Sequence, residues 1–99
     1  MSMLHLVNKS PYERNSLSTC VGYVQQGDAV LLIEDGVYAA MKGGSAAAEV
    51  QGLSDVSVLG PDLAARGISE DRLVEGVKVV DYAGFVDLVE AKDKVQSWL

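Results

Sequence analysis

Short apolar runs recur along the chain, separated by stretches in which apolar residues return every three or four positions. Four such runs occupy residues 3–7, 29–33, 56–59 and 77–82. Each has the length and composition of a β-strand, and the first three run directly into turn-forming residues. Their near-continuous hydrophobicity predicts strands that are covered on both faces, as in a parallel sheet. The run at 29–33 is the most strand-like, and we expect it in the interior of that sheet.

The first helical stretch lies between the first two runs and has two possible starts. Ser10 followed by Glu13 forms a capping-box pattern, whereas Asn15 or Ser16 would cap a shorter helix. Gly27 is expected to end it. From either start, four apolar residues recur at helical spacing and form one stripe that should face the sheet, namely Leu17, Cys20, Val21 and Val24.

Shorter helical stretches follow the later runs. Residues 37–41 predict one or two helical turns, and Ser45 is a possible cap for a short helix over 46–50. A further helix is expected over 61–66, with proline at its first position, and a turn capped by Ser69. The last helix should run from about residue 83 into the low 90s, and Trp98 should pack on the body of the protein or on a partner.

Strands that alternate with helices of this length predict βαβ units with right-handed crossovers. The fold class is therefore α/β, with a small, mostly parallel sheet of about four to five strands and helices on both faces. With 99 residues, the chain is expected to form one domain over residues 1–99.

Composition and charge narrow the possible functions. The chain is 48% hydrophobic and 22% charged, as expected for a compact fold, and carries a net charge of −6. Nucleic acid or an anionic membrane would require a basic face, so neither is expected as a partner. The single cysteine cannot form an internal disulfide, no signal peptide is recognised, and the run at 29–33 is too short to span a bilayer. These features predict a cytoplasmic protein.

Familiar chemical motifs are few. No phosphate-binding glycine motif is present, and one histidine with one cysteine does not supply the usual metal ligands, so no cofactor or metal is expected. His5 is more often a hydrogen-bonded core histidine than a catalyst. Glu34 and Asp35 could form an acid/base pair at a strand end, but capping and turn formation are the commoner roles. The turn at 8–11 could hold an anion at a helix N-terminus, which leaves an anion- or nucleotide-binding domain as a third functional reading.

Cys20 is the candidate catalytic residue, because no other nucleophile stands in a comparable setting. A reactive thiol needs its thiolate form, which a helix N-terminus or a nearby cation would stabilise. The sequence around Cys20 provides neither clearly, and its place on the apolar stripe favours a packing role. Sulfur chemistry and core packing both remain open for this residue at this stage.

Short motifs spread over nearly the whole chain occur in an order typical of one protein family. They are Met3-Leu4-His5, Ser10-Pro11, Gly27-Asp28, Leu31-Leu32, Asp35-Gly36-Val37, Ala39-Ala40, Asp62-Leu63, Ala65-Arg66-Gly67, Asp81-Tyr82, Phe85-Val86 and Trp98. Through them the chain resembles the DsrH/TusB family of sulfur-relay proteins.

This resemblance implies a DsrE-like fold and a subunit of a DsrEFH-type sulfurtransferase heterohexamer. The implied partners are DsrE-like and DsrF-like subunits and a DsrC/TusE-like acceptor, to which sulfane sulfur passes as a cysteine persulfide in dissimilatory sulfur oxidation. A cysteine at the position of Cys20 is typical of the DsrH branch, which makes Cys20 a possible secondary persulfide carrier. The alternative is a non-catalytic structural subunit of a TusBCD-type complex for tRNA 2-thiouridine synthesis.

Overall fold

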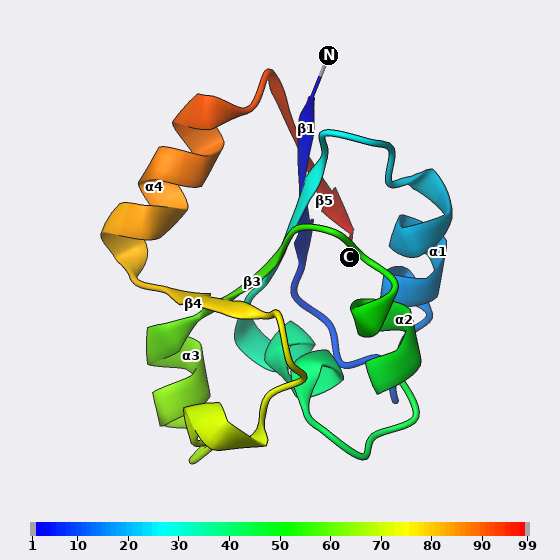
Figure 1. The fold of residues 1–99 in the computed structure, drawn as a ribbon, viewed down its shortest axis with the longest axis vertical. Helices are drawn as coiled ribbons and strands as arrows, with labels where there is room; N and C mark the ends of the chain where they lie inside the picture. The colour runs from blue at the N-terminus through cyan, green and yellow to red at the C-terminus, as the bar shows by residue number, and fades with distance from the viewer. Residues whose placement is uncertain (1, 99) are drawn as a thin grey trace.

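The computed structural model describes residues 2–98, in which five strands form one all-parallel sheet in the order β4-β3-β2-β1-β5 (Figure 1). The strands are β1 (Met3–Val7), β2 (Ala29–Leu32), β3 (Val56–Leu59), β4 (Lys78–Val80) and β5 (Lys94–Trp98). Every neighbouring pair is parallel, so each connection must cross over the sheet. The predicted α/β class is confirmed, and the 29–33 run forms an interior strand as expected.

Helices cover both faces of this sheet. They are α1 (Ser16–Tyr23), α2 (Ala47–Gln51), α3 (Gly60–Ala65) and α4 (Tyr82–Ala91), with 3-10 helices η1 (Glu34–Ala40) and η2 (Glu70–Arg72). In Figure 1, α1 and α2 lie on one side of the strands and α4 lies on the other. None of the helices in the described part of the chain is long and apolar enough to cross a membrane.

The first helix begins at the later of its two predicted starts. Asn15 is its N-cap, while the carbonyl of Ser10 closes a separate turn by accepting from the N–H groups of residues 13 and 14. The helix also ends earlier than predicted, at Tyr23. Asp28 explains the early end, because its carboxylate accepts the backbone N–H of Gln25 at 3.1 Å and fixes a turn ahead of β2.

Boundaries elsewhere also differ from the sequence prediction, and the fourth strand is shorter than the 77–82 run because Asp81 caps α4, which begins at Tyr82. The helical turn expected over 37–41 starts three residues earlier, since η1 covers Glu34–Ala40. Its first residue, Glu34, has a φ of +49°. The next short helix is capped by Ala46, and Ser45 provides no side-chain cap. Both segments lie where several turn-forming residues compete, so no single pattern defines the start.

The fifth strand was not identified as a strand from the sequence, although the predicted strand number allowed for it. β5 lies at the edge of the sheet, its first four residues are exposed, and its apolar residues are Val95 and Trp98. Trp98 ends it and packs on the body of the protein, against His5 and Tyr23, as expected. The edge position brings the C-terminal strand beside the N-terminal one, in register from Met3 with Lys94 to Val7 with Trp98.

The two faces of the sheet are buried to different extents. The face under α1 and α2 carries the larger core, which includes Val7, Leu17, Cys20, Val30, Leu32, Val50 and Val58. Among the described residues, the face under α4 has three fully buried core members, Leu4, Ala29 and Leu31. No residue of α4 itself is fully buried. The α4 side of the sheet is therefore thinly covered.

Candidate functional site

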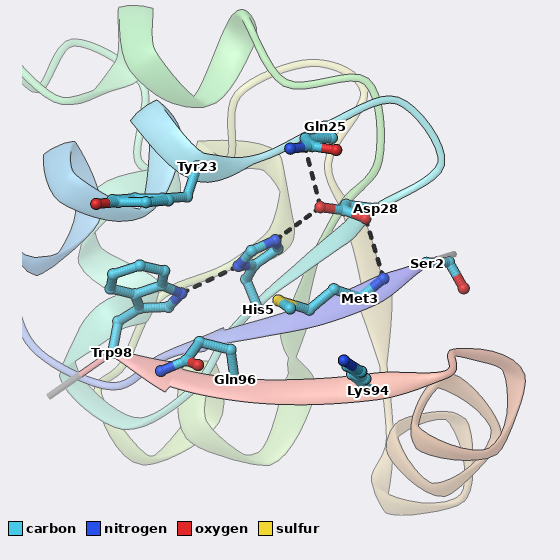
Figure 2. A pocket seen from close by; sticks show the side chains of 9 residues that line it. All are labelled: Ser2, Met3, His5, Tyr23, Gln25, Asp28, Lys94, Gln96 and Trp98. Carbon is cyan, nitrogen blue, oxygen red and sulfur yellow. Dashed lines mark hydrogen bonds and ion pairs between the residues drawn. The ribbon is translucent and has the colours of Figure 1, made fainter.

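A pocket of about 400 Å³ opens beside the β5 edge of the sheet, on the face that α1 covers (Figure 2). Its lining comes from the start of β1, the end of α1, the turn before β2 and alternate residues of β5: Ser2, Met3, His5, Tyr23, Gln25, Asp28, Lys94, Gln96 and Trp98. Glu34 and Asp35, considered as a possible acid/base pair at the carboxyl end of β2, do not line this pocket.

Asp28 is the most heavily hydrogen-bonded side chain of this pocket. Its carboxylate accepts from His5 Nε2 at 2.9 Å, from the Met3 N–H at 3.0 Å and from the Gln25 N–H at 3.1 Å. The hydrogen bond from His5 is the main cause that lowers the pKa of Asp28, and burial opposes it. The buried carboxylate is therefore held in its charged form by three donors.

His5 is held between Asp28 and Trp98, as the dashed lines in Figure 2 show. The indole Nε1–H of Trp98 donates to His5 Nδ1 at 3.0 Å. An indole can only donate, so Nδ1 must carry no proton and the proton sits on Nε2, which points to Asp28. The expectation of a hydrogen-bonded core histidine is confirmed, and sequence reasoning missed both of its partners.

Aromatic rings and one lysine give the pocket its remaining chemistry. The ring of Trp98 stacks on His5 with centroids 6.0 Å apart and lies 5.4 Å from the ring of Tyr23. Lys94 also lines the pocket and forms no ion pair with any described residue. The carboxylate of Asp28 is engaged by three donors, so Lys94 is the charged side chain of the pocket that has no partner among the described residues.

Trp98→Phe should lower the free energy of unfolding by about 1–2 kcal/mol, because it keeps an aromatic ring but leaves His5 Nδ1 without its donor. Chemical denaturation followed by circular dichroism measures this loss. Tyr23→Phe, which keeps the ring packed against Trp98, is the matched control and should change stability by less than about 0.5 kcal/mol. Equal losses in the two variants would contradict the role of the indole N–H.

Cys20 does not line the pocket. Its side chain is fully buried in the core between α1 and the sheet. Burial, assisted by the negative charge of Asp28, raises the pKa of the thiol to about 11. The thiolate needed for sulfur transfer is therefore disfavoured, and the geometry favours packing. A persulfide role for Cys20 stays a prediction.

The two acidic residues that follow β2, Glu34 and Asp35, lie in the first turn of η1. The backbone N–H of Glu34 donates to Asp62 at 2.6 Å, and Asp35 pairs with Arg66 at 2.9 Å. Neither contact joins the two acidic side chains to each other, and no side-chain cap of η1 is formed, so the capping role favoured by the sequence is not the one observed. The turn at 8–11 leads into a loop and is separated from Ser16, where α1 begins, so it forms no anion site at a helix N-terminus. Within residues 2–98, no three His, Cys, Asp or Glu side chains gather as metal ligands would.

The sequence is similar to one family and to several curated proteins over nearly its whole length. The profile of the family described as DsrH like protein matches residues 9–95. A protein named TusB from Pectobacterium parmentieri is 36% identical over 97 residues, which cover 97% of this chain and 100% of that protein. The TusB protein of Sodalis glossinidius is 34% identical over 98 residues, with the same coverage of both chains.

Solved structures show the same fold at lower sequence identity. The YchN protein from E. coli superposes with a TM-score of 0.80 at 20% identity and covers 98% of both chains. A protein of unknown function from Methanobacterium thermoautotrophicum gives a TM-score of 0.73 at 17% identity, covering 96% of this chain and 97% of that one. These likenesses support the fold alone.

The expected role in a DsrEFH-type complex for dissimilatory sulfur oxidation is wrong. The full-length curated relatives are named TusB, which favours the alternative in tRNA thiolation. The error came from using Cys20 to choose between the two branches. A cysteine buried in a core can be retained for packing, so its presence does not distinguish a carrier from a scaffold.

Proposed function

The chain belongs to the DsrH/TusB family, and we propose that it is a non-catalytic structural subunit of a TusBCD-type complex that relays sulfur for tRNA 2-thiouridine synthesis. Its role is to hold partner subunits in place, and sulfur transfer takes place on cysteines of those partners.

The state of Cys20 is the observation that carries this proposal. A relay thiol must meet a sulfane sulfur as an accessible thiolate, because thiolate attack forms the new S–S bond. Cys20 is fully buried, and its pKa is raised to about 11. As the only cysteine of the chain, it leaves no second thiol to take over the transfer. A subunit of a sulfur-relay family with these properties is best suited to assembly.

The partners follow from the family and from the name of its curated members. Family membership implies a sulfur-relay complex with other subunits. TusC-like and TusD-like subunits, in a heterohexamer, replace the DsrE-like and DsrF-like partners of the earlier expectation. A TusE-like protein is the proposed acceptor of a cysteine persulfide, and the complex would work in the cytoplasm, where tRNA is modified.

The α4 side of the sheet supports an assembly role. Tyr82, Val86 and Val89 on α4 are 60%, 54% and 37% exposed, and Val95 on β5 is 44% exposed. Exposed apolar side chains gathered on one face are typical of protein–protein contact surfaces. A partner subunit that packs there would complete the thinly covered core around Leu31.

Cys20→Ala tests the proposal directly. The variant removes the thiol without placing a hydroxyl in the core, so the complex should assemble and transfer sulfur to its acceptor at close to the wild-type rate. Native mass spectrometry of the reconstituted complex measures assembly, and a radiolabelled sulfur donor measures transfer. Loss of transfer from an intact complex, together with a sulfur adduct on wild-type Cys20, would show that Cys20 carries sulfur.

A further inference from the structure

The outer side of β5 and the adjoining pocket are built to receive an extended polypeptide segment. We infer that a partner protein adds a strand to β5 and places an acidic side chain against Lys94 and an apolar or aromatic side chain against Trp98. This docking surface, called the β5 edge below, consists of residues 94–98 and the pocket beside them. The inference rests on the geometry and charge of this surface and does not depend on the proposed function.

The backbone of β5 leaves hydrogen-bonding groups at an open edge. Lys94 donates its backbone N–H to the Ser2 carbonyl, toward β1. Backbone groups alternate sides along a strand, so those of Val95 and Ser97 point away from β1. The Gln96 side chain donates to the Ser97 carbonyl at 3.0 Å, which covers one of these groups. The N–H of Val95, its carbonyl and the N–H of Ser97 remain directed at the edge, as a template for another strand.

The side chains of β5 provide the selectivity. Lys94, Gln96 and Trp98 alternate along the strand and all line the pocket (Figure 2). A strand laid beside β5 would present every second side chain to these three residues. The residue opposite Lys94 and the residue opposite Trp98 are therefore four positions apart, with a polar residue between them. On the other face, Val95 would meet an apolar side chain.

A comparison of the two edges of the sheet supports an acidic partner. Both edge strands begin with a lysine, Lys78 on β4 and Lys94 on β5. Lys78 is paired with Asp55 at 3.3 Å, whereas Lys94 has no acidic partner among the described residues. An uncommitted ammonium group beside an unpaired edge favours a carboxylate from the incoming strand.

The hydrogen bonds that join Asp28, His5 and Trp98 hold the indole ring of Trp98 in place at the docking surface. Trp98 is held by His5, which is held in turn by Asp28, so the indole ring is oriented before any partner arrives. An ordered aromatic anchor lowers the entropy that binding costs. A second copy of this chain is a poorer occupant, because each copy carries a net charge of −6 and β5 itself offers no acidic residue to Lys94.

Peptide titration of the full-length protein, followed by backbone amide NMR, tests the inference. The probe is the capped peptide Thr-Glu-Val-Thr-Val-Phe-Thr, together with its reversed sequence because the strand direction is open. One of the two should shift the amides of Val95, Ser97 and Tyr23 at concentrations of about 1 mM. Methylating the peptide nitrogens that face β5 should weaken binding about tenfold or more, since it removes main-chain hydrogen bonds.

Charge reversal supplies the matched control. Lys94→Glu should weaken binding of the glutamate peptide about tenfold and should favour a peptide with lysine in its place. Lys78→Glu makes the same change on the opposite edge and should alter binding less than about twofold. Four results would each overturn the inference: no shifted amide with either peptide, equal binding of the methylated peptide, equal effects of the two lysine variants, or self-association through β5 that excludes the peptides.

Discussion

Native protein should react with a small aromatic disulfide at Cys20 at least about 100-fold more slowly than the unfolded chain at mildly alkaline pH. The pKa of about 11 lies two units above the ordinary value of 9.0, which alone lowers the thiolate fraction by about 100-fold. Full burial also denies the reagent access to the sulfur. The absorbance of the released thiolate, recorded in native buffer and in concentrated guanidinium chloride, measures the ratio.

The pH dependence sharpens this test. Burial favours the protonated thiol, so Cys20 contributes stability that is present below the ordinary value of 9.0 and is lost as pH rises through about 11. The matched control is Ser18→Cys in a Cys20→Ala background, because Ser18 is exposed on the same helix. That thiol should react nearly as fast in the native protein as in the unfolded one. Rapid labelling of native wild-type Cys20 would contradict the buried thiol and weaken the case for a purely structural subunit.

The fold could be predicted from the sequence where the apolar signal was strong. The runs that form β1, β2 and β3 are buried on both faces and appear as continuous hydrophobic segments. β5 gave no such signal, because an edge strand exposed over most of its length needs few apolar residues, and β5 has two, Val95 and Trp98. The start of α1 was ambiguous for another reason. Ser10 and Asn15 both carry capping side chains, and the choice between them depends on how the loop after β1 packs.

The candidate site was harder to predict, because its parts are distant in sequence. His5 and Trp98 are 93 positions apart and meet only because β5 pairs with β1. No local motif identifies Asp28 as the partner of His5. An acidic residue directly before a strand is as typical of an ordinary turn as of a buried hydrogen-bond acceptor. The one residue that stood out in the sequence, Cys20, lies in the core. Cys20 stood out because it is the only cysteine in the sequence, whereas its burial determines whether the thiol can react.

Asp28→Ala should destabilise the protein by about 3–5 kcal/mol, the largest effect we expect from a single substitution here. The carboxylate satisfies three donors in a buried site: His5 Nε2 and the backbone N–H groups of Met3 and Gln25. Removing it leaves all three without an acceptor and frees the turn that joins α1 to β2. Since a small domain has about 5–15 kcal/mol of stability in total, a large fall in Tm is expected.

A second carboxylate provides the control for this prediction. Asp55 precedes β3 as Asp28 precedes β2, but within residues 2–98 its carboxylate contacts one side chain, the exposed Lys78, at 3.3 Å. Asp55→Ala should therefore cost no more than about 1 kcal/mol. The pKa of Asp28 is lowered in the folded protein, so its stabilising contribution is present above the ordinary value of 3.8 and is lost as pH falls through the lowered pKa. Denaturation curves recorded at neutral and acidic pH should thus show a smaller acid-induced loss of stability in Asp28→Ala than in the wild type. Equal losses for the two alanine variants at neutral pH would mean that the hydrogen-bond network of Asp28, His5 and Trp98 does not stabilise the edge of the sheet, and that its rigid aromatic anchor must be held by other contacts.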